Sequence, residues 1–163
     1  MKSEALFGIS ILMSFIAFGI VVNVYIWPNV RNLQREAALV PLIVPHVFRF
    51  VGLSFLVPGV VGPSLQSSFA VPAAYGDLIA AVLAATAIWA LRVRASWAIT
   101  LVWVFNLWGT ADLLFAVYQG EIGVRIDAGT LGAAFYIPTL IVPALLILHI
   151  LIFRILVKTD RTT

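Results

Sequence analysis

Five long apolar runs, separated by short polar segments, dominate the pattern of this chain. The runs cover residues 5–27, 40–61, 71–91, 96–118 and 131–157. A helix needs about 20 predominantly apolar residues to cross a bilayer, and each run reaches that length. The pattern therefore predicts an all-α, polytopic integral membrane protein with five transmembrane helices in one bundle. Residues 1–163 are expected to form a single transmembrane domain, because no polar block is long enough to fold alone.

The composition agrees with a protein whose solvent is lipid. The chain is 63% hydrophobic and 10% charged, whereas soluble domains carry about 25% charged residues. Membrane lipid is therefore its first expected partner. The net charge of +3 comes from basic residues, which lie mostly at the ends of the apolar runs, where they anchor helices at the membrane surface. No nucleic-acid partner is therefore expected. The absence of cysteine excludes disulfides and thiolate chemistry.

Most of the basic residues fall on one side of the predicted helices. Seven of the ten Lys and Arg residues lie in the first loop, the third loop and the C-terminal segment: Arg31, Arg35, Arg92, Arg94, Arg154, Lys158 and Arg161. Lys2 and Arg125 lie on the other side, and Arg49 lies inside the second run. Because cytoplasmic loops are enriched in Lys and Arg, the sequence predicts an external N-terminus and a cytoplasmic C-terminus.

Six ionisable or amide side chains lie well inside the predicted spans, away from their ends. They are His46 and Arg49 in the second, Asp77 in the third, Asn106 and Asp112 in the fourth, and His149 in the fifth. A charge at the centre of a bilayer costs about 3 kcal/mol on insertion scales, so such groups are kept for a partner or a function. Their depths in the membrane can be estimated from the rise of about 1.5 Å per residue along a helix. By this estimate the carboxylates form an outer layer, the Asn and Arg a middle layer and the histidines an inner layer.

The favoured hypothesis is a site for a small ligand, cation or proton, with a binding or transport role. Asp77 and Asp112 are expected to face each other across the third and fourth helices. Two carboxylates in close contact in a low-dielectric interior repel each other strongly when both are ionised. One of them is therefore expected to hold a proton. Asn106, Arg49 and Tyr75 complete the predicted site, and no catalytic or metal-binding residue is assigned. A purely structural role, in which the charged pairs lock helices together, stays open.

Three other functions remain alternatives. His46 and His149 have similar predicted depths on different helices, so they could be the axial ligands of haem b. The chain could also be a non-catalytic accessory subunit of a larger membrane complex, or form a homo-oligomer, since 163 residues are few for a complete transport pathway. An enzyme is less favoured, because the sequence contains neither a zinc-protease motif nor a nucleophile elbow.

Three segments with polar residues resemble blocks found in uncharacterised bacterial integral-membrane proteins. They are residues 46–49, 72–77 and 106–112. The resemblance implies a bacterial cytoplasmic membrane and carries no activity with it.

Overall fold

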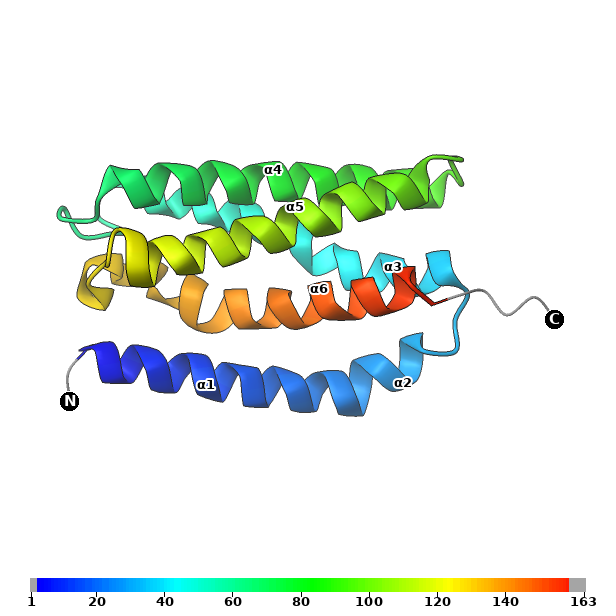
Figure 1. Ribbon diagram of the computed structural model, residues 1–163, viewed down its shortest axis with the longest axis horizontal. Helices are drawn as coiled ribbons and strands as arrows, with labels where there is room; N and C mark the ends of the chain where they lie inside the picture. The colour runs from blue at the N-terminus through cyan, green and yellow to red at the C-terminus, as the bar shows by residue number, and fades with distance from the viewer. Residues whose placement is uncertain (1–2, 159–163) are drawn as a thin grey trace.

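The computed structural model describes residues 3–158, which form a bundle of helices running back and forth along one axis (Figure 1). Five segments are long and apolar enough to cross a membrane: Ser3–Val30, Arg35–Leu56, Ser67–Arg92, Ala98–Gly123 and Ile137–Leu156. The predicted fold class, an all-α bundle with five such helices, is thereby confirmed. With an odd number of spans, the two ends of the chain lie at opposite ends of the bundle.

The first segment lies at the edge of the bundle, alongside α6 (Val142–Leu156). It consists of α1 (Ser3–Val21), one π-helical turn (Val22–Ile26) and the short α2 (Trp27–Val30). Ser14 is the only residue of α1 that is buried. Most apolar side chains of α1 are therefore exposed on the outside of the protein, where lipid would cover them.

The second segment changes helix type part-way along. It begins as α3 (Arg35–Ile43) and continues as a 3-10 helix, η2 (Val44–Leu56). The change coincides with Pro45, at the start of η2, because proline lacks the N–H that a continuing α-helix would use. The sequence predicted one helix over residues 40–61; the helical segment instead begins at Arg35 and ends at Leu56.

The 3-10 conformation sets which side chains of η2 share a face. Residues three apart are eclipsed in a 3-10 helix, so His46, Arg49, Gly52 and Phe55 form one stripe, and all four are buried. In an α-helix, the nine steps from His46 to Phe55 would make about two and a half turns and place the ends of the stripe on opposite faces. The helix type therefore decides that the whole stripe faces the bundle.

The third segment, α4 (Ser67–Arg92), packs against both η2 and α5 (Ala98–Tyr118). Its buried face consists mostly of alanine and glycine, and small residues let helix backbones approach closely. Asp77 lies on this face and is 7% exposed. Asp77 therefore points into the bundle and away from its outer surface.

The last segment is less regular than the predicted helix over residues 131–157. A 3-10 segment (Ala128–Phe135) leads into a π-helical turn (Ile137–Ile141) and then into α6. Gly132 has a φ of +53°, and a Cβ atom there would overlap the Val60 carbonyl oxygen. Glycine is therefore required at this kink.

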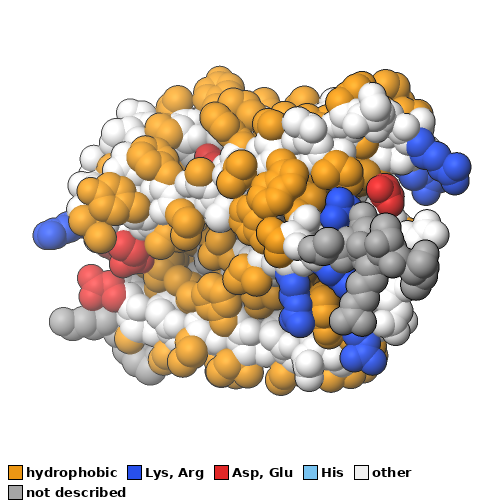
Figure 2. All heavy atoms as spheres, turned by 45° about the vertical axis from the view of Figure 1, so that its right-hand side comes forward, with side chains coloured by type: hydrophobic (Ala, Val, Ile, Leu, Met, Phe, Trp, Pro, Cys, Tyr) orange, Lys and Arg blue, Asp and Glu red, His pale blue; other side chains and the backbone are white. Residues whose placement is uncertain are grey.

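Two apolar clusters of buried residues occupy the two ends of the bundle. The cluster towards the C-terminal end includes Leu39, Ile43, Phe105 and Ile152. The cluster towards the N-terminal end includes Phe55, Phe69, Leu131 and Ile137. The six polar side chains named above lie between these clusters and are called the polar layer below. Apolar side chains are also spread over the middle of the face shown in Figure 2.

Candidate ion-binding site in the helix bundle

Arg49 lies at the centre of the polar layer and is 1% exposed. Its Nε donates to Asp77 Oδ1 at 2.7 Å, and its Nη2 donates to Asp112 Oδ2 at 2.5 Å. Its Nη1 donates to the Gly109 carbonyl oxygen at 3.1 Å. The guanidinium thus joins η2 to α4 and α5. Arg49 thus points into the bundle, and its contacts with two other helices supply the partners that a charge at this depth requires.

The two carboxylates share this single positive charge. Their side chains are 10% (Asp77) and 11% (Asp112) exposed, so both are largely shielded from water. The sequence predicted that the carboxylates would face each other, and the structure adds Arg49 as a bridge to both. With both carboxyls ionised, the three side chains carry a net charge of −1. One further positive charge would neutralise them.

Three glycines provide the space for these polar groups. A Cβ atom on Gly52 would overlap Asp77, and one on Gly76 would overlap the Asp112 carboxylate. A Cβ atom on Gly109 would lie 2.8 Å from both Arg49 Nη1 and His149 Nε2. The sequence analysis did not assign Gly52 or Gly76 to the site. The available signals were the three-residue spacing from Arg49 to Gly52 and the position of Gly76 directly before Asp77.

The two histidines lie together on the C-terminal side of this group. Their ring centroids are 4.2 Å apart, and Phe105 packs against both rings at 5.1 and 5.5 Å. His149 Nδ1 is 2.7 Å from Asn106 Oδ1. Over the described part of the chain, both nitrogens of His46 and the Nε2 of His149 are buried without a hydrogen-bond partner. The prediction that the two rings share a depth agrees with this contact.

The arrangement of the imidazoles does not fit a haem held between them. Two axial ligands must approach the iron from opposite faces of the porphyrin, whose plane then lies between them. The His46 and His149 rings instead contact each other directly, with centroids 4.2 Å apart. A porphyrin has no room between rings in this position.

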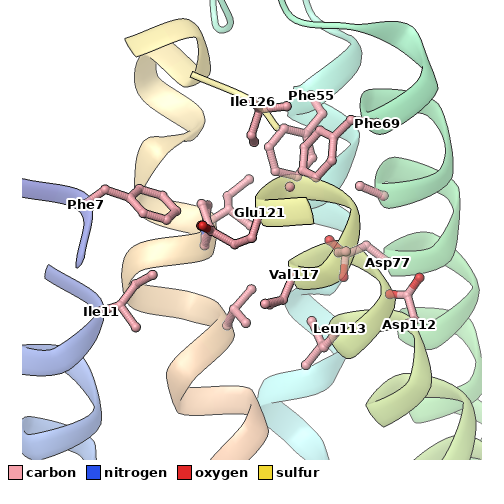
Figure 3. Close-up of a pocket in the computed structure, with 16 residues that line it drawn as sticks. Phe7, Ile11, Phe55, Phe69, Asp77, Asp112, Leu113, Val117, Glu121 and Ile126 are labelled. Carbon is pink, nitrogen blue, oxygen red and sulfur yellow. The ribbon is translucent and has the colours of Figure 1, made fainter. Parts of the chain in front are cut away.

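A cavity of about 70 Å³ borders the two carboxylates on their N-terminal side. Asp77 and Asp112 contribute to its wall, while Phe7 and Ile11 of α1 close the opposite side (Figure 3). The rest of the lining is mainly apolar, with Glu121 as a further acidic group. Because a water molecule needs only about 10–15 Å³ of such space, the cavity can hold several.

A second hollow adjoins this cavity and leads to the N-terminal end of the bundle. The two share Phe7, Ile11, Gly120, Glu121 and Ile126 as lining residues. The outer hollow adds Glu4, Asp127 and Arg125. Carboxylates are thus present both at the entrance and beside the guanidinium.

Two of the predicted site residues lie away from the Arg49 contacts. Asn106 is fully buried but contacts His149: its amide nitrogen donates to the His149 carbonyl oxygen at 3.3 Å. Tyr75 is 53% exposed on the outside of α4. The structure therefore brings together Arg49, Asp77 and Asp112, while Asn106 bonds His149 and Tyr75 lies on the outside.

A family model described as a domain of unknown function, DUF8737, matches residues 6–157. The chain belongs to the DUF8737 family. The match includes the whole polar layer and most of all five long helices. No curated protein and no solved structure matches the chain. Since the family description gives no activity, the chemistry of the site must suggest the function of this DUF8737 member.

Proposed function

We propose that this DUF8737 protein binds a proton or another small cation at Asp77, Arg49 and Asp112, and that the site serves transport. The observation that carries the proposal is one guanidinium shared by two carboxylates beside a cavity. An unbalanced charge in a low-dielectric interior is unfavourable. Binding one positive charge removes the imbalance, so the group is built to hold a monovalent cation.

The surroundings of the site also favour a cation. Glu4, Glu121 and Asp127 lie along the route from the N-terminal end of the bundle. Arg125 also lines this hollow, so the route has three acidic groups against one basic group, and its net negative charge raises the local concentration of cations. On the other side, the apolar cluster containing Phe105 and Ile152 separates the polar layer from the C-terminal end. In this conformation the cation would enter from one side, as one state of an alternating-access cycle requires.

The basic residues support an orientation for this pathway. Figure 2 shows Lys and Arg side chains gathered towards the C-terminal end of the bundle. By the positive-inside rule, that end faces the cytoplasm and the cavity opens to the exterior. Lys2 and Arg161, which contributed to the sequence-based prediction, lie outside the described residues. We propose a bacterial cytoplasmic membrane as the location, with a homo-oligomer or a larger complex as the working assembly.

A structural role in an accessory subunit is the second candidate. Arg49 satisfies all three of its hydrogen-bonding nitrogens within the chain. A network that only locks helices together would look the same in this respect. The two candidates differ in whether a cation enters the site.

Ion flux into liposomes containing the purified protein distinguishes them. A potassium-diffusion potential would drive protons into the liposomes, and a pH-sensitive dye trapped inside would report their entry. Sodium flux would be measured in parallel. We expect flux in the wild type and at least a tenfold loss in Asp112→Asn, which keeps the hydrogen-bonding shape without the charge. Glu36→Gln, an acid-to-amide change at an exposed position near the opposite end, is the matched control and should retain the flux.

Two results would overturn the proposal. If the wild type neither carries nor binds protons or sodium, the structural role is favoured. If Asp112→Asn conducts like the wild type, the cation binds elsewhere.

A further inference from the structure

We propose that the cation is a proton and that His149 Nε2 accepts it, with His46 as the next acceptor towards the C-terminal end. This inference rests on the proposed function, because it names the ion and the receiving atom within the same polar layer. It is carried by three buried imidazole nitrogens that lack a partner in the described residues.

Hydrogen bonds with Asn106 establish the tautomer of His149. The Asn106 amide nitrogen donates to the His149 backbone carbonyl, which turns Asn106 Oδ1 towards His149 Nδ1. A side-chain carbonyl oxygen only accepts hydrogen bonds, so Nδ1 must carry the hydrogen. In the neutral ring, Nε2 then has a free lone pair. That lone pair is buried without a donor, so His149 is ready to accept a proton.

Nε2 borders the charged group at Arg49. His149 Nε2 and Arg49 Nη1 each lie 2.8 Å from the position that a Gly109 Cβ would occupy. The guanidinium alone would repel a protonated imidazole, but Asp77 and Asp112 both bind it. With neutral histidines the layer has a net charge of −1, and a proton on His149 makes it neutral.

All ionisable side chains of the polar layer take part in this charge balance. They come from η2 (His46 and Arg49), α4 (Asp77), α5 (Asp112) and α6 (His149). The single proton that neutralises the layer can therefore be held either by a carboxylate or by an imidazole. A proton that enters through the cavity would first meet Asp112 or Asp77, which line it.

Transfer from Asp112 to His149 requires a water molecule as carrier. The carboxyl O–H bond breaks and gives its proton to the water, while the water gives another proton to His149 Nε2. The carboxylate and an imidazolium result, and the water is regenerated. His46 has both a donor and an acceptor nitrogen without partners. Its ring touches His149, so the N–H bond at His149 can break as one forms on His46.

The full-length protein in lipid nanodiscs, labelled with ¹⁵N-histidine, provides the direct test. His46→Phe assigns the remaining signals to His149. We expect His149 Nδ1 to be protonated throughout a pH titration, and Nε2 to change from unprotonated to protonated as protons bind. In liposomes, His149→Gln should lower proton flux at least tenfold, while Tyr75→Phe, at an exposed position, should not.

The outcomes separate this inference from the proposal on which it rests. If Asp112→Asn abolishes proton flux but His149→Gln does not, and Nε2 stays unprotonated, the histidine role is wrong and the carboxylate site stands. If the wild type carries sodium but no protons, the inference is also wrong while cation binding survives. If it carries and binds neither, both fail. Should His149→Gln not fold, the wild-type nitrogen signals still decide the question.

Discussion

Replacing Arg49 with leucine should destabilise the protein strongly. Arg49 is 1% exposed and is the counter-charge of two carboxylates that are 10% and 11% exposed. Removing one partner of a buried ion pair costs about 3–5 kcal/mol, because the remaining charge is left uncompensated. Here one substitution leaves two carboxylates without their counter-charge and also removes the donor to the Gly109 carbonyl oxygen. We expect the free energy of unfolding of Arg49→Leu to fall by at least about 3 kcal/mol.

Neutralising the two partners should recover much of this loss. In Arg49→Leu/Asp77→Asn/Asp112→Asn no charge remains in the group, so the cost of leaving buried carboxylates uncompensated is removed. The triple variant should therefore unfold at a higher SDS fraction than the single variant. Unfolding in mixed micelles would be measured by circular dichroism. In an additive model, each added substitution would instead lower the stability further.

The comparison has a clear opposing result. The reasoning is refuted if the single variant lies within about 0.5 kcal/mol of the wild type, as surface substitutions usually do. It also fails if the triple variant is less stable than the single one, because the carboxylates would then not be the source of the loss.

The other predictions concern packing, a peripheral side chain and orientation. Gly52→Ala and Gly76→Ala should each lower the free energy of unfolding by about 1–3 kcal/mol through overpacking against the carboxylates. Gly8→Ala, where a Cβ meets nothing within 4 Å, is the control, and equal losses at all three positions would contradict the packing argument. Tyr75→Phe should preserve the ΔG of unfolding to within about 0.5 kcal/mol, because its hydroxyl makes no contact with the Arg49 group; a larger loss in the same SDS titration would show that it does. A reporter fused to the C-terminus should be active only in the cytoplasm, and activity outside would reverse the proposed topology.

The apolar runs were sufficient to predict the number of spans and the polar residues within them. This succeeded because the transfer of a helix into lipid depends on its own length and composition more than on its neighbours. The insertion cost of Arg49 likewise predicted that it would find a partner inside the bundle. Counting residues from the inner helix ends also placed His46 and His149 at one level, because the segments between those ends and the histidines consist mainly of the α-helices α3 and α6.

The rotation of each helix, by contrast, depends on local backbone geometry that composition does not specify. The 3-10 form of η2 aligns His46, Arg49, Gly52 and Phe55, whereas a regular α-helix would have spread them over two faces. This stripe brings the guanidinium between the two carboxylates.

By itself, the sequence determined that this chain is a five-span helical protein with costly polar groups in its interior. Only the tertiary structure decided that one Arg49 serves both Asp77 and Asp112 and that Tyr75 faces outward. It also decided that the rings of His46 and His149 lie in direct contact. The physical reason is that insertion energy follows from each segment separately. Which polar atoms meet depends on helix rotation and on the close approach that Gly52 and Gly76 allow.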